Sequence, residues 1–144
     1  MQLLLFAALS GCKSADDDLS DTQETGTPVE TGTLAGTLNY PGSMPPGAKL
    51  HIAIKADVAV WTAPDYREAH DNPTMPFSYN VPAVPGIYFI GAFLDLTNDS
   101  PGGPASGDPK GVAHDDPGPT QHAVIAKQTT EVPPIDLRVP DQEE

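Results

Sequence analysis

The chain has 144 residues, with 20 acidic and 7 basic side chains that give a formal net charge of −13. Nucleic-acid binding draws its affinity from clustered Lys and Arg, and the basic residues here are scattered, so we expect no nucleic-acid partner. The 17 Pro and 13 Gly leave few windows long enough for a helix and suit short strands joined by turns. The composition therefore predicts one domain that is mainly β.

The N-terminal segment, residues 1–11, holds an apolar run from Leu3 to Leu9. Such a run is typical of the core of an export signal and is too short to span a bilayer. The sequence Leu9-Ser10-Gly11-Cys12 then resembles a bacterial lipobox, although Met1-Gln2 lacks the basic residue usual at the start of a signal. The resemblance implies removal of residues 1–11, lipid on Cys12 and a protein of the cell envelope that is held to the membrane by its lipid anchor.

The cysteine content favours this lipid anchor. Cys12 is the chain's one cysteine, so an exported form cannot make an internal disulfide, and acylation accounts for the odd residue. Each buried methylene contributes roughly 0.8 kcal/mol, so several acyl chains hold a protein stably to a membrane. Lys13, directly after the cysteine, favours the outer membrane over an inner one. The alternatives are a cytosolic protein with an incidental thiol and an enzyme with a reactive thiol.

An acidic linker follows, in residues 12–33. From Lys13 onward it is poor in apolar residues and rich in Asp, Glu, Thr and Gly, so it cannot bury enough surface to offset the entropy of ordering. The composition predicts a disordered tether that lets the domain move roughly 25 Å from its anchor. We interpret the run Asp16-Asp17-Asp18 as solvated charge rather than as a cation site.

The folded domain is expected over residues 34–140, with an acidic tail at residues 141–144. Residues 86–94 are apolar on both faces and predict a central strand that is covered on both sides. Residues 62–75 carry Pro, Asp and Asn and predict a long surface loop. Short strands between turn clusters predict an all-β, antiparallel β-sandwich. The expected strands are residues 34–40, 49–56, 77–81, 86–94, 122–127 and 134–139, and the expected core includes Ile52, Ile54, Phe89, Phe93 and Leu137.

Four short motifs are spread over this domain. They are Leu34-Ala35-Gly36-Thr37-Leu38, the pair Val81-Pro82, the segment Pro85-Gly86-Ile87-Tyr88 leading into Ala92-Phe93-Leu94-Asp95, and the closing Ile135-Asp136-Leu137. Together they resemble the carboxypeptidase regulatory-like, or transthyretin-like, domain. The resemblance covers most of residues 34–140 and implies a Greek-key antiparallel sandwich of seven strands. It also implies an accessory, binding or adhesive role rather than catalysis.

Sequence motifs for catalysis are missing. The chain has no Gly-x-Ser-x-Gly turn for a nucleophilic serine and no His-Glu-x-x-His zinc motif, so we expect no enzyme. The four histidines fall in four different segments. His114 and His122, with Asp115 and Asp116, could hold zinc if their loop folds back, but polar loop residues facing water are the commoner outcome.

One loop has oxygen-bearing residues at alternating positions after a strand, as calcium loops do. The possible ligands are Asp95, Thr97, Asp99 and Asp108. The loop departs from the tight calcium pattern, because Thr97 replaces Asp or Asn, Ser100 replaces glycine, and no glutamate closes it. The alternative is a turn in which Asp and Asn side chains bond the backbone. Calcium is the one cofactor that the sequence suggests.

Trp61 and Tyr66 flank the predicted surface loop and could form an aromatic platform for a carbohydrate or a peptide. A single tryptophan at a strand end is more often a lid on the core. The two functional hypotheses are therefore a module that binds an envelope protein or glycan, and a structural spacer or assembly part of an envelope complex. A concave pocket with aromatic residues favours the first, and a large exposed apolar patch favours the second.

Overall fold

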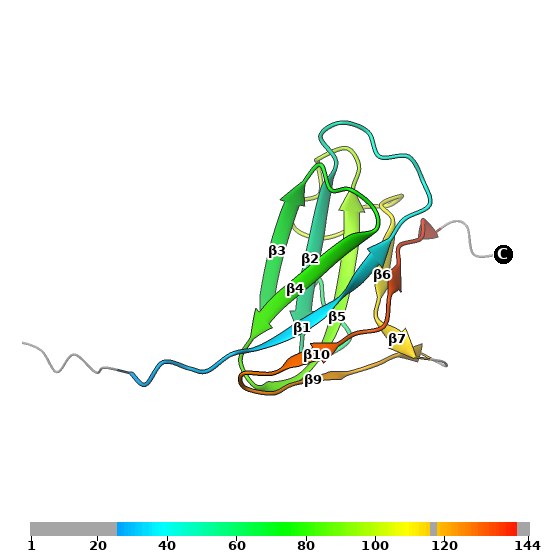
Figure 1. The fold of residues 1–144 in the computed structure, drawn as a ribbon. Coiled ribbons are helices and arrows are strands. Elements are labelled where there is room, and N and C mark those ends of the chain that lie inside the picture. The colour runs from blue at the N-terminus through cyan, green and yellow to red at the C-terminus, as the bar shows by residue number, and fades with distance from the viewer. Residues whose placement is uncertain (1–25, 116–117, 141–144) are drawn as a thin grey trace, which may run out of the picture.

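The computed structural model describes residues 26–115 and 118–140, which form two facing β-sheets (Figure 1). The all-β sandwich predicted from the sequence is confirmed. The predicted signal, Cys12, most of the tether and the acidic tail at 141–144 lie outside the described residues. Within the described ranges, no helix is long and apolar enough to cross a membrane.

The first sheet is arranged around β1 (Gly32–Asn39). On one side β1 pairs antiparallel with β4 (Phe77–Ala83). On the other side it pairs in parallel with β10 (Thr129–Glu131) and further along with β11 (Ile135–Asp136). Two prolines between β10 and β11 lack the N–H that an unbroken ladder needs, so the two strands stay separate. These two short pairs are parallel, whereas the longer pairs of both sheets are antiparallel, as predicted.

The second sheet has β2 (Lys49–Lys55) between β3 (Tyr66–Asp71) and β5 (Gly86–Asp95), in antiparallel pairs. The far side of β5 pairs with β6 (Lys110–Val112) and with β9 (His122–Val124). Figure 1 shows β4 and β1 crossing in front of β3, β2 and β5. The chain thus passes from one sheet to the other between β1 and β2, between β3 and β4, and between β4 and β5.

The core lies between the two sheets. Successive strand residues point to opposite faces of a sheet, so every second residue of β1 and of β2 faces the core, and most of these residues are apolar. Truncating one of these side chains to alanine is expected to cost about 2–5 kcal/mol. The largest fully buried side chains of the core cluster are Leu34, Leu38, Leu50, Ile52, Ile54, Val81, Ile90, Leu94, Ile135 and Leu137.

A second apolar layer covers the outer face of the second sheet. Phe93 is fully buried, yet it pairs across the sheet with His51 and lies outside the core cluster. The Trp61 ring meets the Phe93 ring edge-on, with centroids 4.8 Å apart. A Cβ atom on Gly91 would lie 2.8 Å from Cγ2 of Val60, so glycine lets this loop approach the strand. Loop residues therefore cover the outer face of β5, as its two apolar faces predicted.

Several sequence predictions about strands were wrong. Residues 62–75 contain the edge strand β3, because backbone pairing with β2 holds a segment whose side chains are mostly polar. Phe89 is half-buried rather than buried, because it pairs with Lys55 at the end of the sheet. The structure also has strands that no apolar pattern marks, namely β6, β10 and the short hairpin of β7 (His114–Asp115) and β8 (Gly118–Pro119). The expected strands 122–127 and 134–139 shorten to β9 and β11.

Candidate functional site

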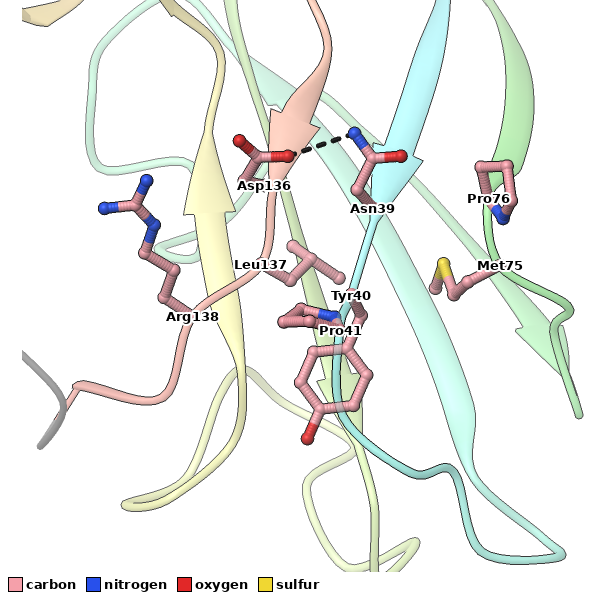
Figure 2. Close-up of a pocket in the computed structure, with 8 residues that line it drawn as sticks. All are labelled: Asn39, Tyr40, Pro41, Met75, Pro76, Asp136, Leu137 and Arg138. Atoms are coloured by element: carbon pink, nitrogen blue, oxygen red, sulfur yellow. Dashed lines mark hydrogen bonds between the residues drawn. The ribbon is translucent and has the colours of Figure 1, made fainter.

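A groove of about 420 Å³ opens at one end of the sandwich (Figure 2). It lies where β1 and β11 end, next to the residues that directly precede β4. Its lining is mostly apolar, with an amide, a carboxylate and a guanidinium among the lining groups. Ligand sites usually combine apolar walls with a few polar groups in this way. The lining residues are Asn39, Tyr40, Pro41, Met75, Pro76, Asp136, Leu137 and Arg138.

The polar side of the groove is held by the pairing of β1 with β11. Asn39 and Asp136 are register partners, and the Asn39 side-chain amide donates a hydrogen bond of 3.0 Å to the Asp136 carboxylate. The Leu137 amide donates to the Asn39 carbonyl at 2.8 Å, which carries the ladder past the end of β11. These bonds fix the ends of β1 and β11, so the side chains of Asn39 and Asp136 hold their positions without a ligand.

The apolar side is tied to the core. Leu137 is fully buried, and Tyr40 and Met75 are partly buried side chains packed against the core cluster. In Figure 2 the Arg138 side chain lies on the far side of Leu137 from Met75. An apolar ligand segment could rest between Tyr40 and Met75 while a polar group reaches Asp136. Apolar walls with a few polar groups suit the binding of a ligand.

The structure places the predicted calcium residues in a loop organised by backbone amides. Asp95 is buried, and its two carboxylate oxygens accept hydrogen bonds from the amides of Asp99 and Ser100 at 3.1 and 2.8 Å. Burial opposes the ionisation of Asp95, but amide hydrogen bonds from the loop lower its pKa below the usual value. Thr97 is exposed.

Asp108, the last predicted ligand, is also turned inward. It is buried, and its carboxylate accepts a hydrogen bond of 2.8 Å from the Ala105 amide. Within residues 26–115 and 118–140, no three His, Cys, Asp or Glu side chains lie close enough together to hold a metal. These contacts are those of the Asx-turn alternative, and the calcium hypothesis stays a prediction.

Trp61 and Tyr66 are not brought onto one surface. Tyr66 is the register partner of Ile54 and packs against the core, so it belongs to the inner face of the second sheet. Trp61 packs on Phe93 at the outer face. The structure thus has no common platform for these two rings, and Trp61 instead covers the outer layer.

The histidine pair considered for zinc is split. His114 is exposed in β7, whereas His122 is buried in β9. The Asp116 position lies outside the described residues. Neither histidine belongs to a group of three possible metal ligands in the part of the chain that the structure describes.

Sequence reasoning missed a cluster on the outer face that joins His51, Arg67 and Phe93. The imidazole of His51 stacks on the Phe93 ring, and the Arg67 guanidinium carbon lies 5.7 Å from the centre of that ring. Arg67 Nη2 is 2.9 Å from His51 Nδ1. Burial, and then the charge of Arg67, lower the pKa of His51. The sequence offered one signal for this cluster: His51 lies on the polar face of β2, and its cross-strand partner on β5, Phe93, is apolar.

No protein-family model matches the chain, and no curated protein matches it. Among solved structures, it is similar to an alternative pilotin from the type II secretion system of Vibrio cholerae. That match has 12% sequence identity and a TM-score of 0.41, and it covers 76% of this chain and 98% of the pilotin. A likeness at this level assigns neither a family nor a function.

Proposed function

We propose that this chain is a lipoprotein of the cell envelope, anchored in the outer membrane through lipid on Cys12, that presents a non-catalytic β-sandwich as a binding module. The observation that carries the proposal is the order of segments in one chain. An apolar run ends in Leu9-Ser10-Gly11-Cys12, an acidic stretch follows, and a sandwich begins at β1. This is the arrangement of a signal, an anchor, a tether and a presented domain.

The groove at the end of β1 supports the binding part of the proposal. It is concave, it includes the Tyr40 ring, and its volume of about 420 Å³ lies within the usual range for ligand sites, roughly 300–1,000 Å³. The sequence criterion for a binding module was a concave pocket with aromatic residues. A protein segment or a glycan that offers an apolar face and a hydrogen-bond donor to Asp136 fits this lining.

A second candidate function is an assembly part of an envelope complex, and a different observation favours it. Val84, Ile87 and Ile125 are 48%, 57% and 49% exposed. Val84 lies in the turn before β5, and Ile125 directly follows β9, whose residues pair with the start of β5. Exposed aliphatic side chains at one end of paired strands are typical of a contact surface.

The anchoring proposal is tested by fractionating cells of the native host that express the full chain, Cys12→Ser or Ser14→Ala. We expect the parent and Ser14→Ala in the membrane fraction and Cys12→Ser released from it or left with its signal uncleaved. Mass spectrometry of the mature N-terminus should show acyl groups on Cys12. An unmodified Cys12 in the native host would contradict the proposal.

The binding module and the assembly part are separated by cross-linking in the native host. Tyr40→Ala changes the groove, and the double variant Ile87→Ser with Ile125→Ser changes the exposed aliphatic end. Loss of a specific cross-linked partner in Tyr40→Ala alone supports the binding module. Loss in the double variant alone supports the assembly part.

A further inference from the structure

A second pocket, of about 400 Å³, lies on the outer face of the second sheet. It shares no lining residue with the groove at the end of β1. Its charged lining residues are Lys49 of β2, Arg67 and Glu68 of β3, and Asp95 at the end of β5. The sign of the charge that this pocket offers depends on how those four groups are already engaged.

Both carboxylates of the pocket are engaged elsewhere. Asp95 is 1% exposed, and its two oxygens accept loop amides. Glu68 points to the inner face, where one oxygen bonds Tyr66 and the other bonds His70, each at 2.9 Å. Neither carboxylate forms an ion pair with Arg67 or Lys49 among the described residues, although Asp95 keeps its negative charge.

Arg67 is a half-buried cation without an anionic partner among the described residues. Lys49, Lys55 and Lys127 each form an ion pair with a carboxylate, and Arg67 forms none. Its guanidinium can only donate hydrogen bonds, so in its contact with His51 the Nδ1 atom accepts and the imidazole is neutral. Most of its five N–H groups have no acceptor in these contacts. A partly desolvated charge left in this state costs free energy that an anion would recover.

Lys49 lines the same pocket as Arg67 and adds a second positive charge to it. Its ammonium is 3.3 Å from the Asp71 carboxylate, whose side chain is 77% exposed. A pair of this kind is weak, since water and salt screen it, so the ammonium can turn toward a ligand.

We propose that this pocket binds a carboxylate group, with the Arg67 guanidinium forming a two-pronged contact and Lys49 supplying a second positive charge. The cation–π contact of Arg67 with the Phe93 ring helps to hold the planar guanidinium in place, which suits the planar carboxylate. A singly charged anion matches one unpaired guanidinium on a chain of net charge −13 better than a doubly charged phosphate does. The carboxylate can belong to a small organic acid or to the C-terminus of a peptide. This inference does not depend on the lipid anchor.

The test uses nuclear magnetic resonance of the detergent-solubilised full chain. The probes are sodium acetate, N-acetyl-Ala-Ala-Ala with a free carboxylate, the same peptide as an amide, and inorganic phosphate. We expect saturable shifts of the Arg67 Nε–H signal and of the Lys49 and Ala69 amides with the two carboxylate probes and none with the amide. Tighter binding of the peptide than of acetate would indicate a peptide C-terminus as the source, and equal binding a small acid.

The variants make the test specific to Arg67. Arg67→Gln should weaken binding of the carboxylate probe about tenfold or more, and Lys49→Gln should weaken it less. Lys127→Gln removes a positive charge that does not line the pocket and should bind as the parent does. If Arg67→Gln fails to fold, the test rests on the Arg67 Nε–H signal of the parent, which should shift saturably with the carboxylate probes and stay unchanged with the amide. The proposal is overturned by no saturable shift in the parent, by equal binding of the amide, by tighter binding of phosphate, or by undiminished binding in a folded Arg67→Gln.

Discussion

The imidazole of His51 lies flat on the ring of Phe93, with the ring centroids 4.5 Å apart and an angle of 12° between the planes. Both residues are buried on the outer face of the second sheet. His51 Nε2 has no hydrogen-bond partner among the described residues. A buried, neutral imidazole of this kind ties stability to pH.

We expect the free energy of unfolding to fall as the pH drops below about 6.5, the ordinary pKa of histidine. Burial, and then the charge of Arg67, lower the pKa of His51 in the folded chain; Asp95 opposes them with a smaller effect, and Lys49 (lowering) and Asp108 (raising) act less still. The unfolded chain therefore binds a proton first, and stability is lost between pH 6.5 and the lower, folded pKa. Above pH 6.5 His51 is neutral in both the folded and the unfolded chain, so its contribution to the free energy of unfolding no longer changes with pH.

This pH dependence can be measured by urea unfolding at several pH values between about 5.5 and 7.5, above the range where most carboxylates titrate. His51→Phe keeps an aromatic ring on Phe93 but removes the titrating group, so its stability should depend less on pH. His114→Gln changes an exposed histidine and should behave as the parent does. Equal pH dependence in the parent and in His51→Phe would contradict the prediction.

Tyr79→Phe is expected to leave stability unchanged or to raise it slightly. The Tyr79 hydroxyl is buried and has no hydrogen-bond partner among the described residues, so removing it takes away an unsatisfied polar group. Tyr88→Phe is the matched control, because the Tyr88 hydroxyl donates to the Val84 carbonyl at 3.1 Å. The control should lose about 0.5–1.5 kcal/mol in chemical unfolding. A loss in Tyr79→Phe as large as in Tyr88→Phe would show that the hydroxyl has a partner.

Gly91→Ala is expected to destabilise the chain by about 1–3 kcal/mol through overpacking. The new methyl would lie 2.8 Å from Cγ2 of Val60 and 3.2 Å from Cζ2 of Trp61. Gly102→Ala is the control, since a Cβ there meets nothing within 4 Å. The control should be neutral or slightly stabilising, because alanine has fewer unfolded conformations to lose. Thermal unfolding of both variants checks this, and a neutral Gly91→Ala would mean that the Val60 loop does not rest on β5.

Asp95→Asn is expected to lower stability by about 1–3 kcal/mol even with chelator present, because a neutral amide accepts the loop N–H groups less well than a carboxylate. The calcium hypothesis adds a separate effect. A bound ion would raise stability by about 2.7 kcal/mol at a hundredfold excess over Kd, and Asp99→Asn would remove that gain. Thermal midpoints with chelator and with millimolar calcium separate the two. No calcium-dependent rise in the parent would leave the Asx turn as the full account of this loop.

Much of the fold could be predicted because local pattern and burial coincide in the central strands. Ile52 and Ile54 alternate with polar or small residues, and both are buried in the core as expected. The apolar run of residues 86–94 correctly indicated a strand covered on both faces, and Phe93 is buried there. Edge strands were harder to predict, because β3 is held by backbone hydrogen bonds that leave no apolar period in its side chains.

The sequence by itself determined the class of the fold, the position of its central strands and the acidic character of the chain, because these follow from residue type and from a period of two along the chain. Only the tertiary structure decided which residues share a surface. It separated Trp61 from Tyr66 by the thickness of one sheet, and it joined Asn39 with Asp136, which are 97 positions apart. Among the described residues, it also left Arg67 without a carboxylate partner. The physical reason is that sheet register and loop packing depend on pairing between distant segments, which no local pattern encodes.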